Sequence, residues 1–247
     1  MARAFKIAVA FAALVGACPL FAQAPVATEK YAKREGFSFS ADAPVRILLF
    51  RPEIKVGEQT TAGMFQNNVE WHAAAQRELT AALVTQSKRR GLEIVAHDDT
   101  VSDGAELAEH RALFRLVVSS IMRHKFFGKD LLPTKKDRFD WSLGSGVALI
   151  APSAQADYGL FLLSQDSYPS SGRSAAILVS TLMGNNHNAG THIGYAALFD
   201  LKSGEIIWLS ADLRAAGDVR TGEGAVKRVE QLMTGFPTRK LKETLSQ

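Results

Sequence analysis

The stretch GTHIGYAALFDLKSGEIIWLS, residues 190–210, predicts a long β-hairpin. Its first arm, residues 193–201, is apolar on both faces, as is typical of a strand in the middle of a sheet. The second arm, residues 205–209, is rich in β-branched and aromatic residues, and Gly204 between the arms permits the positive φ of a tight turn. We therefore expect this hairpin to organise the sheet, with the rest of the chain as its cover.

The segments around the hairpin alternate between strand and helix patterns. Apolar runs predict strands at 44–51, 92–96 and 157–164, and apolar residues at helical spacing predict helices at 69–90, 103–122 and 222–236. Polar, glycine-containing stretches predict loops at 57–68 and 168–173, while 174–183 fits either a short helix or a strand. This order predicts an α/β (α+β) fold, with a mixed β-sheet, a central C-terminal hairpin and about three to four covering helices.

The N-terminus predicts export. Two basic residues, an apolar run and small residues follow one another over residues 1–22, which is the pattern of a secretory signal peptide. Cleavage between Ala22 and Gln23 would release a soluble protein. Alternatively, VGAC at residues 15–18 is similar to a bacterial lipobox, which makes Cys18, the single cysteine of the chain, the candidate lipidation residue.

The domain organisation follows from this export pattern. After the signal peptide we predict a flexible tether at 23–43, one α/β domain at 44–236 and a C-terminal tail at 237–247. Removal of Arg3 and Lys6 lowers the 29 basic residues to 27 against 25 acidic ones, so the mature chain is nearly neutral and predicts no nucleic-acid partner. Membrane contact is expected only through a lipid anchor, because no later apolar run reaches spanning length.

The patterns that suggest chemistry lack the spacing that it needs. Gly144-Ser145-Gly146 has no third glycine at position 149, which a dinucleotide fingerprint requires. His187 and His192 do not form a recognised metal-ligand pair. We therefore predict no catalytic, cofactor-binding or metal-binding residues. Tyr168 and Arg173, an aromatic and a cation around a Pro/Ser/Gly stretch, are the candidate partner-binding residues.

Several short motifs resemble a periplasmic α/β group. They are VRILLF at 45–50, a long helix ending at Gly91 before LEIV, ADY at 156–158 and ALFDLKSGEIIW at 197–208. The group includes the curli-secretion channel lipoprotein, the lipoprotein activator of penicillin-binding proteins and the amino-terminal domain of TolB. The resemblance implies a non-enzymatic envelope protein that docks or assembles with other proteins.

The sequence thus predicts an exported, non-enzymatic module that binds or assembles in the periplasm, either soluble or anchored to the outer membrane by lipid. Its expected partner is another envelope protein, and no cofactor is expected. Two alternatives stay open. One is an envelope hydrolase with a serine or carboxylate site, and the other is a subunit of a pore-forming oligomer. The candidates for the hydrolase site would be Ser164, Ser170, Ser171, Ser174 or the Asp98-Asp99 pair.

Overall fold

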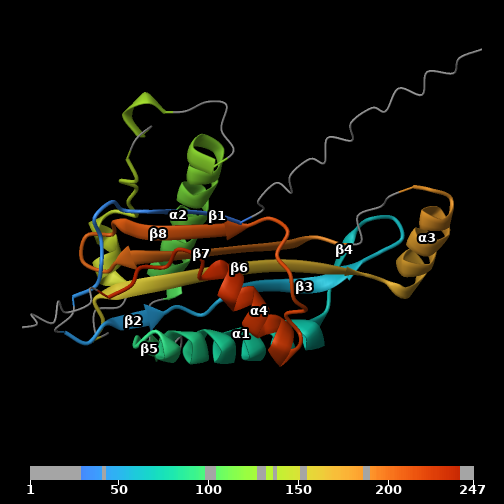
Figure 1. Cartoon of the computed structure of the whole chain (residues 1–247), viewed down its shortest axis with the longest axis horizontal. Coiled ribbons are helices and arrows are strands. Elements are labelled where there is room, and N and C mark those ends of the chain that lie inside the picture. The colour runs from blue at the N-terminus through green and yellow to red at the C-terminus, as the bar shows by residue number, and fades with distance from the viewer. Residues whose placement is uncertain are drawn as a thin grey trace, which may run out of the picture.

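A computed structural model describes residues 29–40, 43–97, 104–126, 132–135, 138–150, 155–185 and 190–239. An open mixed sheet of eight strands runs through this part of the chain, with helices on both of its faces (Figure 1). The strands are β1 Glu29–Lys33, β2 Arg46–Leu49, β3 Glu53–Gln59, β4 Phe65–Asn67, β5 Glu93–Ala96, β6 Tyr158–Pro169, β7 His192–Asp200 and β8 Ile206–Asp212. The α-helices are α1 Val69–Arg89, α2 Gly104–Ile121, α3 Ser171–Leu182 and α4 Gly222–Leu232. The predicted fold class is confirmed.

The predicted hairpin is present as β7 and β8, inside the strand order β1-β8-β7-β6-β2-β5. Its turn is held by Asp200, whose carboxylate accepts hydrogen bonds from the backbone N–H groups of Lys202 and Ser203. Gly204 has φ 73°, a left-handed conformation that favours glycine. Trp208 is fully buried. The hairpin therefore lies in the interior of the sheet, as the apolar pattern of its first arm predicts.

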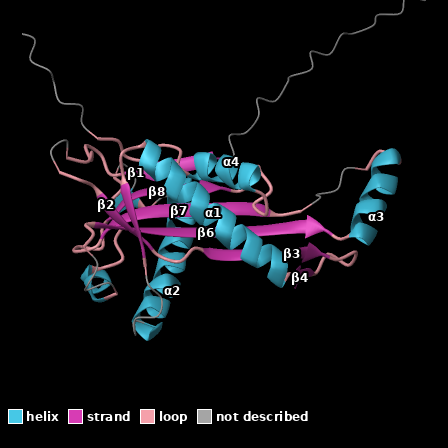
Figure 2. Ribbon diagram, turned by 90° about the horizontal axis from the view of Figure 1, so that it is seen from below, coloured by secondary structure: helices cyan, strands magenta, loops and turns pink. Residues whose placement is uncertain are grey.

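Two apolar cores lie on opposite faces of the sheet. Helices α1 and α4 contact each other and cover one face, where Leu79 and Val229 pack on the sheet. Helix α2 covers the other face through Leu107 and Phe114, together with short turns at Met122–Phe126 and Ser145–Leu149. Figure 2, seen from below, shows α1 and α4 lying across this face of the sheet. Along β2 and β6, successive residues face one core and then the other, as the pleat of a strand requires.

Strand β6 is longer than predicted and joins two parallel partners. Its first part pairs with β2 and its last part with β3, which itself pairs with β4. The loop predicted at 57–68 is therefore mostly a hairpin. Gly57 suggested a loop, but its role is close approach, because a Cβ at this position would lie 2.1 Å from the carbonyl oxygen of Gln66.

The loop predicted at Tyr168–Arg173 is also absent. Tyr168 and Pro169 end β6, and Ser170 caps α3 by accepting a hydrogen bond from the backbone N–H of Arg173. Serine and proline are frequent in loops, but they equally suit a helix start and the end of a strand. Residues 171–182 are helical, which decides between the two structures expected for 174–183.

Part of the segment predicted to be a flexible tether is ordered. Residues Glu29–Lys33 form β1, which pairs antiparallel with β8, and Phe39 packs against the rings of Tyr158 and Phe236. This ordering comes from aromatic burial that composition alone does not reveal. The predicted signal peptide, with Cys18, Ala22 and Gln23, lies outside the described residues. No helix in the described ranges has the length and apolar character needed to cross a membrane.

Candidate functional site

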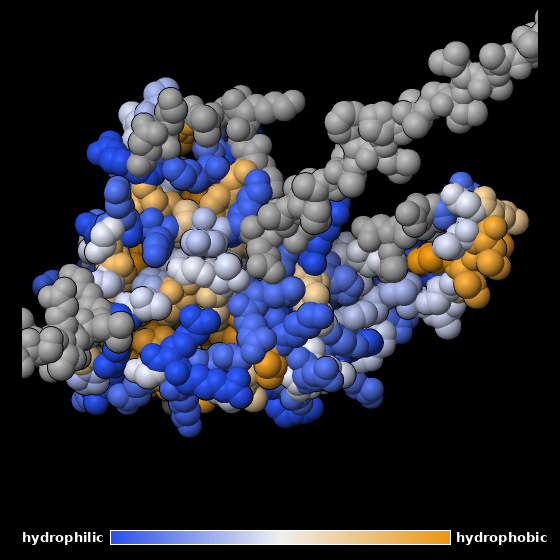
Figure 3. Space-filling model, in the orientation of Figure 1, coloured by the Kyte–Doolittle hydropathy of each residue, from blue (hydrophilic) through white to orange (hydrophobic). Residues whose placement is uncertain are grey.

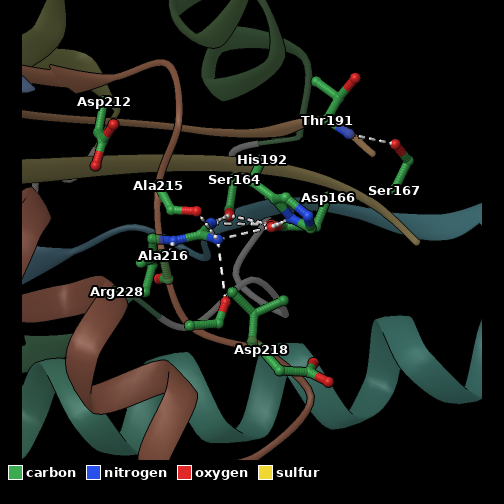
Figure 4. Close-up of polar contacts among 12 residues, drawn as sticks. Ser164, Asp166, Ser167, Thr191, His192, Asp212, Ala215, Ala216, Asp218 and Arg228 are labelled. Atoms are coloured by element: carbon green, nitrogen blue, oxygen red, sulfur yellow. Dashed lines mark hydrogen bonds and ion pairs between the residues drawn. The ribbon is translucent and has the colours of Figure 1, made fainter. Parts of the chain in front are cut away.

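A buried ion pair lies between β6 and α4. Asp166 and Arg228 of α4 are each 0% exposed, and their side chains form two hydrogen bonds, Nη2 to Oδ1 at 2.7 Å and Nη1 to Oδ2 at 3.0 Å (Figure 4). Ser164 donates its hydroxyl to Asp166 Oδ2 at 2.7 Å, and His192 lies with Nδ1 2.8 Å from Oδ1. Both carboxylate oxygens are therefore fully engaged, which a charge buried in an apolar core requires.

Arg228 also holds the segment between β8 and α4. Its guanidinium donates to the carbonyl oxygens of Ala215, Ala216 and Gly217 at 3.5, 3.3 and 3.3 Å. These carbonyls have no strand partner, so the arginine supplies the donors that a sheet would otherwise provide. The ion pair thus joins β6, β7, α4 and the chain before α4 into one rigid unit.

The pKa of Asp166 is below its usual range. Burial by itself raises the pKa of this carboxyl, but the hydrogen bonds from His192, Arg228 and Ser164 and the charge of Arg228 outweigh burial. Asp166 is therefore ionised at neutral pH. Ser164 donates to this carboxylate and is itself buried, so its hydroxyl is not placed as the nucleophile of a hydrolase.

A second cluster surrounds Arg220, next to the ion pair. Its guanidinium lies 3.8 Å from the ring centre of Tyr168 and 4.2 Å from that of Trp71, and Asp218 binds it with two hydrogen bonds. The Arg220 hydrogen bond lowers the pKa of Asp218 to about 2. The Tyr168 hydroxyl accepts from the backbone N–H of Val219 at 3.2 Å, and burial raises its pKa. Tyr168, a predicted partner-binding residue, is thus packed into the fold.

Arg173, the other predicted partner-binding residue, lies in the first turn of α3. Its guanidinium donates to the carbonyl oxygen of Thr60, in the turn between β3 and β4. Gly172 makes a further close approach here, since a Cβ on it would lie 3.3 Å from the Thr61 hydroxyl. The structure therefore places Tyr168 and Arg173 in separate clusters, and Arg173 fastens α3 to the β3–β4 hairpin.

Helix α3 presents its apolar side to solvent. Its residues Arg173, Ile177 and Ser180 are half-buried and lie on one side of the helix. The opposite side, which we call the outer side, carries Leu178, Val179 and Leu182 and continues into the C-cap residue Met183. The exposures of these four large apolar side chains lie between 52% and 81%. Figure 3 shows this apolar surface at the end of the molecule. A helix on a globular domain normally buries its apolar side, so α3 is the reverse of the usual arrangement.

Sequence reasoning did not find Asp166, Arg228 or the outer side of α3, but two of them leave a signal. In β6 the residues facing one core alternate as Leu160, Leu162, Ser164 and Asp166, so the apolar series changes to polar. Arg228 likewise interrupts the apolar side of α4, between Ala225 and Val229. A buried acid and a buried base on facing elements predict an ion pair. The direction in which α3 faces depends on its tertiary contacts and leaves no such signal.

Other sequence candidates lie elsewhere. The Asp98-Asp99 pair and His187 are outside the described residues, and Gly144 precedes a short 3-10 helix at Ser145–Leu149. Within the described ranges, no group of three or more histidine, cysteine, aspartate or glutamate residues is placed to hold a metal ion.

Comparisons with known proteins find only distant structural similarities. No family model matches the chain, and no curated protein matches it. Among solved structures, the PelC dodecamer from Paraburkholderia phytofirmans is 9% identical, with 86% of this chain and 99% of that chain covered and a TM-score of 0.38. A variant of the same dodecamer, with one leucine replaced by methionine, is 8% identical over 83% and 96%, with a TM-score of 0.37. At such values the similarity assigns neither a family nor a function to this chain.

Proposed function

We propose that this protein is an exported, non-enzymatic protein of the bacterial envelope that acts by docking onto another envelope component through α3. Export rests on the signal-peptide pattern of residues 1–22. Docking rests on one observation, the outward apolar side of α3. Single exposed apolar residues are ordinary on protein surfaces, whereas a gathered set marks an interaction site.

The two predicted partner-binding residues, Tyr168 and Arg173, contribute to this function by positioning α3. Arg173 connects the helix to the β3–β4 turn, and Ser170 caps its first turn. Tyr168 ends β6 in the aromatic cluster around Arg220, only a few residues before α3 begins. In this proposal both residues fix the orientation of α3, and the contact with the partner is made by Leu178 and its apolar neighbours.

Cysteine protection in cells tests the docking function. Neither form of the mature protein has a free thiol, because Cys18 is acylated in one interpretation and removed in the other. Leu182→Cys therefore introduces a single reactive site on the outer side of α3. Arg89→Cys, at the exposed end of α1, is the matched control. Labelling by a polar maleimide is measured in cells with a permeabilised outer membrane and in the purified protein.

We expect labelling at Leu182→Cys to be about tenfold slower in cells than in the purified protein, because a covered thiol is protected from reagents. Arg89→Cys should label at the same rate in both. Equal rates for Leu182→Cys in cells and in solution would show that α3 is uncovered in the cell and would refute the proposal.

A further inference from the structure

The apolar surface at the α3 end is built from two separate segments. Besides α3, the β3–β4 hairpin exposes Met64 in its turn, at 66%, and Phe65 at the start of β4, at 42%. The two segments meet where Arg173 binds the Thr60 carbonyl, and Figure 1 shows α3 and the hairpin at the same end of the sheet. We call this surface, formed by residues 60–65 and 171–183, the apolar end.

The apolar end is almost free of charge. Arg173 is the only charged residue in these two segments, although 22% of the whole chain is charged. The guanidinium of Arg173 points back to the hairpin turn, away from the outer side of α3. No charged group therefore has to lose its water when the outer side of α3 enters an apolar medium, which would otherwise oppose such a transfer.

As a deepening of the proposed docking function, on which it rests, we infer that the apolar end binds the surface of a lipid bilayer. With 12 residues, α3 is about 18 Å long and too short to cross a hydrocarbon core of about 30 Å. Leu178 and Leu182, and likewise Val179 and Met183, are four residues apart, so they form one strip along the helix. This geometry fits a helix that lies in the plane of the interface with its strip among the acyl chains.

The absence of a charged side on α3 agrees with this position. Free interfacial helices need a strongly polar side because that side faces water. The inner side of α3 instead rests on the protein, with Arg173, Ile177 and Ser180 half-buried. Binding should therefore depend on apolar burial and not on attraction to anionic headgroups. It should be independent of salt and should occur on zwitterionic lipid.

A second copy of the chain is a less suitable occupant. Two helices of about 18 Å that pack side by side bury far less than the roughly 1,200 Å² of a stable protein interface. A bilayer surface needs no complementary shape.

Vesicle flotation tests the inference. The mature chain that begins at Gln23 lacks both Cys18 and the apolar run of the signal peptide, so neither an acyl group nor that run contributes to binding. It is mixed with phosphatidylcholine vesicles at low and high salt. The test variant is Leu178→Ser/Leu182→Ser. The matched control is Leu116→Ser/Leu149→Ser, which removes two leucines that are 68% and 62% exposed, from α2 and from the 3-10 helix. Sedimentation equilibrium of each protein gives its oligomeric state.

We expect the parent and the control to float with the vesicles at both salt concentrations, and the partition of the test variant to fall by at least about tenfold, as expected when two leucines no longer enter lipid. Equal flotation of the test variant and the control, or no flotation of the parent, would overturn lipid binding. A parent dimer that becomes monomeric in the test variant, with no flotation, would overturn it in favour of a second copy. If the parent does not float while Leu182→Cys stays protected in cells, lipid binding fails and the docking function stands.

Discussion

Two neighbouring regions, the end of β6 and helix α3, depart in opposite ways from the usual distribution of polar groups outside and apolar groups inside. Asp166 brings a charge into the core, and just beyond the end of the strand α3 turns apolar side chains into solvent. The buried charge has all its partners within the chain, namely Arg228, Ser164 and His192. The outer side of α3 is open to solvent. The first departure is therefore explained by the fold. Among the described residues no contact explains the second, which the docking proposal assigns to a partner.

The largest effect on stability is expected at the ion pair. Arg228→Met leaves Asp166 buried without its cation and frees three backbone carbonyls, so we expect a loss of about 3–5 kcal/mol in the free energy of unfolding. Denaturant titration measures this loss. The double variant Asp166→Leu/Arg228→Met should lose less than the single variant, because it leaves no unpaired charge. A loss below about 1 kcal/mol for Arg228→Met would place the network outside the core of the fold.

The same comparison predicts a pH dependence. Because the pKa of Asp166 is lowered in the folded state, its contribution to stability is complete above the unfolded value of about 3.9 and is lost as the pH falls through the folded pKa. The unfolding free energy of the wild type minus that of Asp166→Leu/Arg228→Met should therefore be constant near neutral pH. This difference should decrease as the pH falls below about 4. A difference that stays constant down to pH 3 would contradict the ionised pair.

The aromatic cluster should have an intermediate effect. Arg220→Gln removes the cation between Trp71 and Tyr168 and the ion pair with Asp218, all partly exposed. We expect a loss of about 1 kcal/mol, the sum of an exposed cation–π contact and a surface ion pair. Arg77→Gln, which removes an exposed pair with Glu78 on α1, is the control and should change stability by less. Equal losses for the two variants would mean that the stacked rings contribute nothing.

The smallest effect on stability is expected at α3. Leu178→Ser/Leu182→Ser should change the free energy of unfolding by less than about 0.5 kcal/mol, because both side chains are exposed in the folded protein. Thermal or denaturant unfolding of the purified variant checks this. A loss of more than about 2 kcal/mol would show that the leucines pack within the fold, and α3 would then resemble the ion pair instead of contrasting with it.

Much of the fold follows from local patterns. The hairpin at β7 and β8, helix α1 with its apolar stripe and glycine end, and strand β5 are predictable because each carries its own periodicity and turn residues. The structure differs from the sequence prediction at β3, at β4 and where β6 leads into α3. These segments contain Gly57, Pro169 at the end of β6 and Ser170 at the N-cap of α3. These residues are equally compatible with loops, and their actual roles depend on what lies beside them in space.

The candidate site was harder to predict for the same reason. Residue type indicates Tyr168 and Arg173, which lie just before α3 and in its first turn, but the structure gives both of them intramolecular partners. Asp166 and Arg228 are 62 residues apart in the chain, so their pairing becomes visible only when β6 and α4 are packed together. The orientation of α3 is set by Arg173 and the β3–β4 turn, contacts that no single stretch of sequence encodes.

Strand β1 imposes an order on folding. It comes near the beginning of the chain, yet its hydrogen-bond partner is β8, near the end, with Glu29 opposite Asp212. Closure of this edge requires almost the whole polypeptide, and contacts between such distant segments form slowly because the loop-closure entropy is lost first. A chain that is threaded through a translocon from its N-terminus would therefore stay unclosed until synthesis and passage are nearly complete.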